Sequence, residues 1–191
     1  MTPRIVLASS SPRRKELLLQ IGLSFTVAPE DIDENVLPGE QPEAYAARVA
    51  LDKARIASQR AGEGVIIAAD TIVVIGDSIL GKPADAHDAK RMLAMLSGKE
   101  HRVVTALAVM DATTAKSVTR TSVTKVWFRD LSDREITDYV ATGEPLDKAG
   151  AYGIQERGAL LVERIEGCYS NVVGLPLSLL GELLREFGVY L

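Results

Sequence analysis

The feature that most constrains the fold is an uninterrupted apolar run, Val65–Ala69, that ends in a carboxylate, Asp70. The run is rich in branched residues, which favours a strand. A strand with one face in water alternates apolar and polar residues, whereas a strand covered on both faces is apolar throughout. We therefore predict a buried strand here, within a sheet that is covered on both faces.

The other apolar patterns alternate between helix and strand, with one or two antiparallel strand pairs, which predicts an α/β chain with a mixed sheet. We expect one domain over residues 1–191, because no repeat, low-complexity tract or linker divides the chain. Helices are expected over Pro12–Ile21, Pro42–Ala61, Asp85–Leu96, Ser132–Ala141 and Leu177–Phe187. Strands are expected over Ile5–Ala8, Phe25–Ala28, Val65–Ala69, Thr71–Ile75, Arg102–Met110, Ser117–Phe128 and Leu160–Val162, with a return strand after the Gly76-Asp77 turn.

Charge and composition exclude several classes of protein. A net charge of −4 and only 5% aromatic residues give no general attraction for nucleic acid or an anionic membrane. One cysteine, Cys168, and two separated histidines, His87 and His101, argue against a disulfide framework and a zinc site. No apolar stretch is long enough for a membrane span or a signal-peptide core. We expect a cytoplasmic protein with no nucleic-acid or membrane partner.

A basic helix start follows the first expected strand. In Ser9-Ser10-Ser11-Pro12-Arg13-Arg14-Lys15, Ser11 suits the N-cap and Pro12 the first helical position. Basic residues oppose the positive end of the helix dipole, so three in one first turn need a reason. A small-residue loop, free N–H groups and guanidinium groups together make an anion site suited to a polyphosphate. A solvated basic turn is an equally good explanation of this pattern alone.

Asp70 lies where ligands bind in open α/β sheets, beyond the carboxyl end of a strand. A carboxylate there can hold Mg²⁺ against phosphate oxygens or take a proton from an attacking water molecule. Glu34, in the acidic segment Glu30–Glu34, is a further candidate metal ligand. A surface aspartate at a strand end and a solvated acidic loop are the alternatives.

The segment Gly76–Lys82 has the spacing of a Walker A loop but does not fit one. Pro83 stands where that motif needs a Ser or Thr hydroxyl for Mg²⁺. Ile79 and Leu80 are also unsuited to a loop whose backbone wraps phosphate. We predict a β-hairpin instead, with Lys82 as a phosphate contact, and reject a P-loop kinase.

Charged residues among glycines mark a third segment, Gly143–Gln155. Such a composition makes a poor core and a good pocket wall, although an ordinary surface loop has it too. Asp147 and Lys148 are expected to form an ion pair, in either a functional or a purely structural role. Gln155 carries both a donor and an acceptor, which suits the imide edge of uracil or thymine.

In their order along the chain, these segments resemble the Maf family. The resemblance covers the whole sequence and rests on Leu7–Leu18, Asp52-Lys53-Ala54, Ala69-Asp70-Thr71, Gly81-Lys82-Pro83, Leu96-Ser97-Gly98, Glu144–Gln155 and Asn171–Pro176. It implies a nucleoside triphosphate pyrophosphatase with an elongated mixed β-sheet flanked by helices, two lobes and a central cleft, like the inosine triphosphatases. The Asp147–Gln155 version resembles the subgroup that acts on dTTP and UTP, and differs from a sister subgroup that prefers 7-methyl-GTP. The family usually has Gly where this chain has Glu156.

The resemblance also implies roles for single residues. Asp70 corresponds to the proton acceptor, and Arg13, Thr71 and Gln155 correspond to the positions linked to substrate choice. The phosphate-binding candidates are Ser9, Ser11, Arg14, Lys53 and Lys82. Asp70 and Glu34 are the candidate ligands of a divalent cation, Mg²⁺ or Mn²⁺. Whether Asp70 acts as a base or a metal ligand stays open, as does a homodimer. The alternative function is a non-enzymatic, nucleotide-binding regulator of cell division and septum formation.

Overall fold

The computed structural model describes residues 3–191. Its strands are β1 (Ile5–Leu7), β2 (Thr26–Val27), β3 (Val65–Ile75), β4 (Ser78–Leu80), β5 (Glu100–Asp111), β6 (Ser117–Phe128) and β7 (Val162–Glu166). Its helices are α1 (Pro12–Gln20), α2 (Pro42–Ala61), α3 (Ala86–Leu96), α4 (Asp133–Ala141), α5 (Tyr169–Val173) and α6 (Leu177–Arg185), with 3-10 helices η1 (Glu144–Asp147), η2 (Ala149–Ala151) and η3 (Glu156–Leu161). Within residues 3–191, no helix is both long and apolar enough to cross a membrane.

The predicted α/β class and mixed sheet are confirmed. One seven-stranded sheet has the order β2-β1-β3-β5-β6-β7, and β4 pairs with β3. Strand β1 runs parallel to both β2 and β3. The β3–β4 hairpin and the β6–β7 pair are antiparallel. The hairpin predicted in place of a Walker A loop is therefore present.

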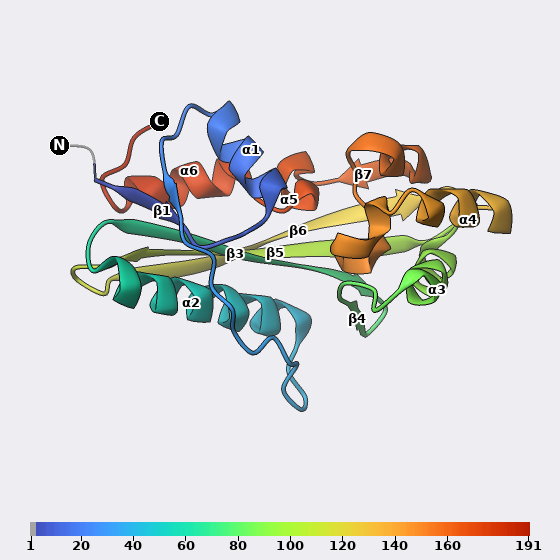
Figure 1. The fold of residues 1–191 in the computed structure, drawn as a ribbon, viewed down its shortest axis with the longest axis horizontal. Helices are drawn as coiled ribbons and strands as arrows, with labels where there is room; N and C mark the ends of the chain where they lie inside the picture. Colours follow the sequence, from blue (N-terminus) through green and yellow to red (C-terminus); the bar gives the residue numbers. More distant parts are fainter. Residues whose placement is uncertain (1–2) are drawn as a thin grey trace. The chain divides into compact units, whose positions relative to one another are not determined.

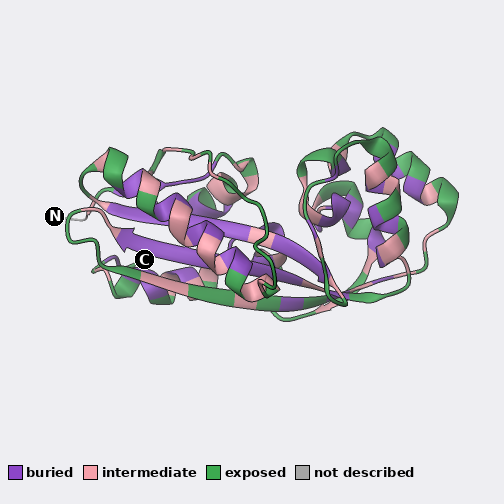
Figure 2. Cartoon of the chain, turned by 90° about the horizontal axis from the view of Figure 1, so that it is seen from below, coloured by how far each residue is buried: buried purple, intermediate pink, exposed green. Residues whose placement is uncertain are grey.

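The chain folds into two compact units. The first comprises the described part of Met1–Asp70, together with Thr105–Ser122 and Gly174–Leu191. In this unit α2 covers one face of the sheet, and α1 and α6 cover the other (Figure 1). The run Ile66–Ala69 of β3 is fully buried between them, as predicted for a strand covered on both faces. Figure 2 shows buried and exposed residues alternating along these helices, as amphipathic packing requires.

The second unit comprises Thr71–Val104 and Val123–Val173. Helices α3 and α4 pack against each other, and their starts are capped by side chains. Asp85 accepts a hydrogen bond from the N–H of Asp88, and Ser132 and Glu135 form a reciprocal capping box. The core of this unit is apolar, and within it the rings of Phe128 and Tyr152 pack edge to face.

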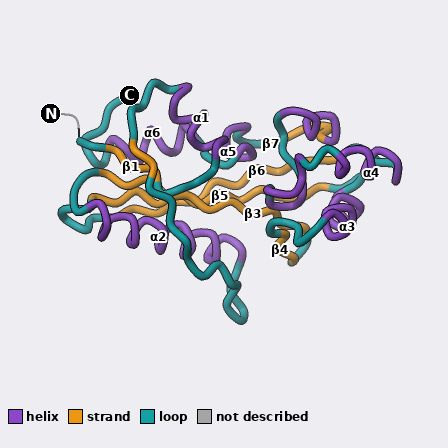
Figure 3. The backbone as a smooth tube through the Cα atoms, viewed as in Figure 1, coloured by secondary structure: helices purple, strands orange, loops and turns teal. Residues whose placement is uncertain are grey.

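Residues 143–173 differ from the sequence-based prediction in one omission and one error. This stretch holds three 3-10 helices and the short helix α5, none of them expected (Figure 3). The expected strand at Leu160–Val162 instead begins only at Val162, because Leu160 and Leu161 belong to η3. Packing rather than local pattern sets these turns. A Cβ on Gly150, whose φ is +69°, would stand 2.7 Å from the Val73 side chain.

Candidate active site

The loop between β1 and α1 places its hydroxyls around the helix start. Pro12 occupies the first turn of α1, as predicted. Ser11 stands at the N-cap position, but its side chain makes no capping hydrogen bond within the described residues, so the predicted capping role is wrong. The N–H of Ser11 donates instead to Oγ of Ser9, at 3.3 Å. Ser9 is buried, and its hydroxyl organises this loop.

Arg14 ties three segments of the first unit together. Its Nε donates to the carbonyl oxygen of Gly174 at 2.8 Å. Its Nη1 donates to Oγ of Ser9 at 3.1 Å and to the carbonyl oxygen of Ala69 at 2.9 Å. Burial lowers the pKa of the guanidinium, and the negative charge of Asp70 opposes that change. Arg14 therefore fixes the middle of β3 at Ala69, a contact that its predicted phosphate role did not include. The prediction that Asp70 stands beyond the end of a strand is wrong, because β3 continues through Asp70 to Ile75.

A lysine joins the two candidate carboxylates. Nζ of Lys53, on α2, lies 3.0 Å from Oδ1 of Asp70 and 2.6 Å from Oε1 of Glu34. Asp70 and Lys53 are buried, whereas the side chain of Glu34 is 51% exposed. The structure thus brings together three predicted site residues from three separate segments. One ammonium between two carboxylates leaves the cluster with a net negative charge that a cation can offset.

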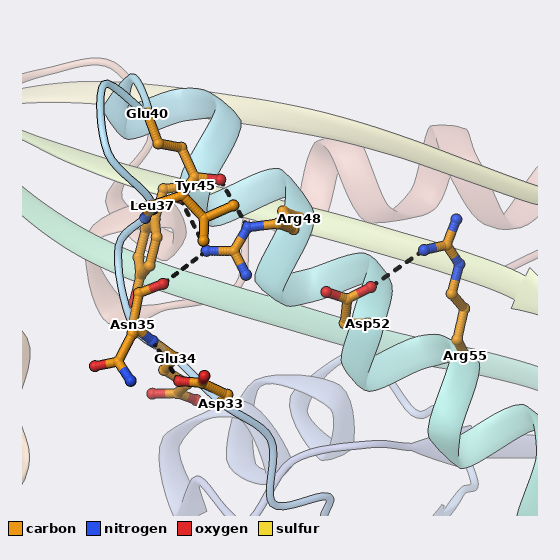
Figure 4. A network of polar contacts seen from close by, with 9 residues as sticks. All are labelled: Asp33, Glu34, Asn35, Leu37, Glu40, Tyr45, Arg48, Asp52 and Arg55. Atoms are coloured by element: carbon orange, nitrogen blue, oxygen red, sulfur yellow. Dashed lines mark hydrogen bonds and ion pairs between the residues drawn. The ribbon is translucent and has the colours of Figure 1, made fainter.

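Glu34 belongs to the acidic loop, residues 30–40, and this loop is fastened to α2 (Figure 4). The hydroxyl of Tyr45 donates to the carbonyl oxygen of Glu34 at 2.7 Å. Burial, and then the charges of Asp70 and Glu34, raise the pKa of Tyr45 to about 12. The hydroxyl therefore keeps its proton near neutral pH and remains a donor. No motif in the sequence marked Tyr45.

Arg48 holds the same loop through a bidentate ion pair. Its Nε and Nη2 donate to the carboxylate of Glu40 at 2.7 and 2.9 Å, and Nη2 also donates to the carbonyl oxygen of Asn35 at 2.9 Å. The N–H of Leu37 also donates a hydrogen bond to the Glu40 carboxylate. Sequence reasoning missed Arg48, although a basic residue on the helix that follows an acidic loop was a weak signal.

Asp70 and Glu34 are the two carboxylates of this cluster that could hold a divalent cation. Across residues 3–191, no three His, Cys, Asp or Glu side chains gather as a metal-binding group. Mg²⁺ is commonly held by one or two carboxylates plus substrate phosphates, without a protein cage. Asp70 and Glu34, whose oxygens reach a common ammonium, provide a donor pair of that kind.

The other candidates are distributed over both units. Arg13 is half-buried on α1 of the first unit. The second unit holds Thr71, half-buried directly after Asp70, and Lys82, exposed after β4. Gln155 is half-buried at the start of η3 in that unit. The N–H of Gly150 donates to the carbonyl oxygen of Gly81 at 3.0 Å, which ties the Lys82 segment to η2.

The glycine-rich segment does form a pocket wall, as predicted. An open pocket of about 790 Å³ within the second unit is lined by Thr142, Gly143, Glu144, Asp147, Lys148, Glu156 and Arg157. The expected ion pair is present, with Nζ of Lys148 2.8 Å from Oδ1 of Asp147. The Glu144 carboxylate accepts hydrogen bonds from the Tyr139 hydroxyl and the N–H of Gly158.

Comparisons with known proteins agree with these features. The model of the family described as Maf-like protein matches residues 4–187. The dTTP/UTP pyrophosphatase of Anaeromyxobacter dehalogenans is 54% identical over 190 residues, 98% of this chain and 96% of that protein. A protein of the same name from Acetivibrio thermocellus is 52% identical over 193 residues, 97% and 96% of the two chains.

A solved structure, the Ham1 protein of Staphylococcus aureus, matches the fold. Its TM-score is 0.51 at 16% identity, with 96% of this chain and 99% of that chain covered. This likeness supports the predicted α/β architecture alone. The family match spans nearly the whole chain, from before β1 to the end of α6. The chain therefore belongs to the Maf family.

Proposed function

We propose that this chain is a nucleoside triphosphate pyrophosphatase that converts dTTP and UTP to the monophosphate and pyrophosphate. The observation that carries the proposal is the Lys53 ammonium between Asp70 and Glu34, in the unit that also holds the basic start of α1. The names of two relatives more than 50% identical to this chain support the reaction and the substrates.

In the proposed reaction, a water oxygen attacks the α-phosphorus of the nucleotide. The bond from that phosphorus to the bridging oxygen breaks, pyrophosphate leaves, and Asp70 accepts the proton of the water. Lys53 orients Asp70 through their 3.0 Å contact. Arg14 fixes the main chain of β3 directly before Asp70. A general base of this kind contributes roughly 10²–10⁴ to the rate.

Negative charge develops on the leaving pyrophosphate and needs positive partners. We assign this role to the cations of Lys82 and Arg14, with the hydroxyls of Ser9 and Ser11, in the loop before α1, as hydrogen-bond donors to the phosphates. Asp70 and Glu34 would hold Mg²⁺ or Mn²⁺, which when bound neutralises phosphate charge. The single domain over residues 1–191, a cytoplasmic location and a homodimer are further parts of the proposal.

Arg13, Thr71 and Gln155 are proposed to select the substrate. A uracil or thymine edge presents carbonyl acceptors and one N–H donor, and a glutamine amide can pair with both kinds. Cytosine reverses part of that pattern. We expect the site to be open at the thymine methyl group, which is then worth less than the roughly 1–3 kcal/mol of a methyl group in a closed apolar pocket. dTTP and UTP should therefore be comparable substrates, and dCTP and CTP poor ones.

The direct test is a product assay on the purified chain with dTTP, UTP, dCTP, CTP, ATP and GTP. Pyrophosphate and orthophosphate are measured separately, with Mg²⁺, with Mn²⁺ and with EDTA. The proposal expects pyrophosphate from dTTP and UTP, only with a divalent cation. Orthophosphate as the direct product, or full activity in EDTA, contradicts the mechanism. Nucleotide binding without turnover would favour the non-enzymatic regulator instead.

A further inference from the structure

The acidic loop would be unstable without cations from elsewhere. Residues 30–40 carry Glu30, Asp31, Asp33, Glu34 and Glu40, and apart from one turn they form no regular secondary structure. Like charges so close along a chain repel one another and favour an extended, solvated segment. Glu34 is also half exposed. Nothing within the loop itself holds the Glu34 carboxylate near Asp70.

Helix α2 supplies cations to the acidic loop at three positions along its length. Arg60 pairs with Glu30 at 2.7 Å near the helix end, and Lys53 pairs with Glu34 at 2.6 Å near its middle. Seven residues, about two turns, separate Lys53 from Arg60, so both lie on one side of the helix. Arg48 pairs with Glu40 nearer the start of α2. The loop thus runs along the helix that carries the catalytic candidate Lys53.

The contacts beside Glu34 differ from ordinary surface ion pairs. Tyr45 is a buried residue of α2, and its hydroxyl bonds the main-chain oxygen of Glu34 itself. Arg48 bonds the main-chain oxygen of the next residue, Asn35, as well as the carboxylate of Glu40 (Figure 4). Contacts to two successive carbonyl groups fix the backbone there, and so limit the directions in which the Glu34 side chain can point.

We propose that Tyr45 and Arg48 are positioning residues that hold the Glu34 carboxylate at Lys53 and Asp70. Tyr45 and Arg48 bond the main-chain oxygens of Glu34 and Asn35, so they act through the backbone at Glu34. The inference rests on the proposed function for its activity measurements. Substituting Tyr45 or Arg48 should lower activity only where the Glu34 carboxylate is present. Substituting a residue that merely stabilises α2 should lower activity with or without that carboxylate.

The activity test compares Tyr45→Phe and Arg48→Ala with a matched control, Arg55→Ala. Arg55 lies on the same helix, is exposed, and pairs with Asp52 rather than with the loop. One hydrogen bond is worth about 0.5–1.5 kcal/mol net, so Tyr45→Phe should lower kcat by roughly 2- to 10-fold. KM for dTTP should change less than kcat. Arg48→Ala should lower kcat at least as much, and Arg55→Ala should match wild type.

A double-mutant cycle separates positioning from general stability. Tyr45→Phe is made both in wild type and in Glu34→Gln, and kcat is measured for all four proteins. If Tyr45 acts through the Glu34 carboxylate, the second substitution adds less than about a twofold loss in the Glu34→Gln background. An equal fold-loss in both backgrounds overturns the proposal. Wild-type kcat in Tyr45→Phe and Arg48→Ala, or in Glu34→Gln, also overturns it.

Amide hydrogen exchange gives a readout that needs no turnover. The peptide over residues 31–40 should exchange faster in Tyr45→Phe and Arg48→Ala than in wild type and Arg55→Ala, while β3 peptides stay unchanged. Unchanged exchange in that loop contradicts the proposal even if activity falls. A wild-type chain that releases no pyrophosphate would refute the proposed function, and the exchange comparison would then decide separately whether these two residues hold the loop.

Discussion

The two units hold their candidate residues in different ways. In the first unit, Asp70, Lys53 and Glu34 are joined by ion pairs of 2.6 and 3.0 Å, and Arg14 anchors β3 at Ala69 beside them. In the second unit, Lys82 is exposed and Gln155 half-buried, on segments built from turns and 3-10 helices. Preorganised charge lowers the barrier of a reaction, whereas side chains at loop ends recognise the substrate. We therefore expect proton transfer to depend on the first unit, and selectivity, apart from the contribution of Arg13, to depend on the second.

The largest effect should come from Asp70→Asn. The substitution keeps the shape of the side chain but removes its charge and its basic oxygens. Loss of a general base alone lowers the rate by roughly 10²–10⁴, so kcat for dTTP should fall by at least about 100-fold while the fold is retained. Circular dichroism and steady-state kinetics of the purified variant measure both.

Asp77→Asn is the matched control, because Asp77 is an exposed carboxylate in the turn that follows β3. It should keep wild-type kcat. An Asp70→Asn protein that retains more than about a tenth of wild-type kcat would show that another group is the base. The assignment of chemistry to the first unit would then fail.

Substitutions at two lysines, one buried in the first unit and one exposed in the second, test whether the cost in stability differs between the units. Lys53→Met leaves Asp70 buried without its cation, and breaking a buried pair costs on the order of 3 kcal/mol of unfolding free energy. Lys82→Met removes an exposed cation and should change stability by less than about 0.5 kcal/mol. Both should lower kcat/KM for dTTP. Urea unfolding and kinetics distinguish them.

The double variant Lys53→Met, Asp70→Asn refines this test. Without the buried charge, much of the lost stability should return, because the remaining amide needs no counterion. If the double variant is as unstable as Lys53→Met alone, packing of the lysine stem and not the ion pair stabilises this part of the first unit.

Sequence patterns predicted the first unit better than the second, for a physical reason. The strand over Val65–Ala69 and the range of α2 follow from periodicity, which is a local signal, although β3 continues past the strand end predicted at Asp70. The 3-10 helices around Gly150 depend instead on its approach to Val73, a contact that no local pattern contains. Tyr45 and Arg48 were missed for the same reason, since their partners are main-chain oxygens of a distant loop.

A buried histidine makes the second unit sensitive to acid. His101 is buried, its Nε2 lies 2.8 Å from the Tyr152 hydroxyl, and its ring meets Phe128 edge-on. Burial lowers its pKa to about 4, an effect that the main chain of Lys99 partly offsets. The unfolded chain takes up this proton below about pH 6.5. Stability should therefore fall as the pH drops from 6.5 toward 4, by roughly 2 kcal/mol between pH 7.5 and pH 5.

His101→Gln removes the titrating imidazole. Because the carboxylates titrate in both proteins, the difference between the variant and wild type gives the contribution of His101. Urea unfolding at both pH values should show a smaller pH-dependent loss in the variant than in wild type. The same loss in both proteins would mean that His101 is not the group responsible.

Gln155→Ala tests selectivity for the base and leaves the ion pairs of Asp70, Lys53 and Glu34 unchanged. A buried group left unpaired costs about 1–3 kcal/mol, so kcat/KM for dTTP and UTP should fall roughly tenfold, while their advantage over CTP narrows. Measuring kcat/KM for dTTP, UTP, dCTP and CTP on both proteins decides the point. A uniform loss across all four nucleotides would show that Gln155 does not read the base.

The smallest effect concerns backbone strain in the second unit, at Glu156. Its φ of +52° lies in the left-handed region, where a side chain costs about 1–2 kcal/mol. Glycine avoids that cost but loses more entropy on folding, about 0.5–1 kcal/mol. Glu156→Gly should therefore raise the unfolding free energy by no more than about 1 kcal/mol.

Ala115→Gly, at a φ of +60° in the first unit, is the matched control. Equal gains at both positions would mean that the Glu156 side chain contributes nothing to stability. A loss at Glu156 alone would mean that its carboxylate, which lines the pocket with Lys148 and Arg157, stabilises the loop by more than the strain costs.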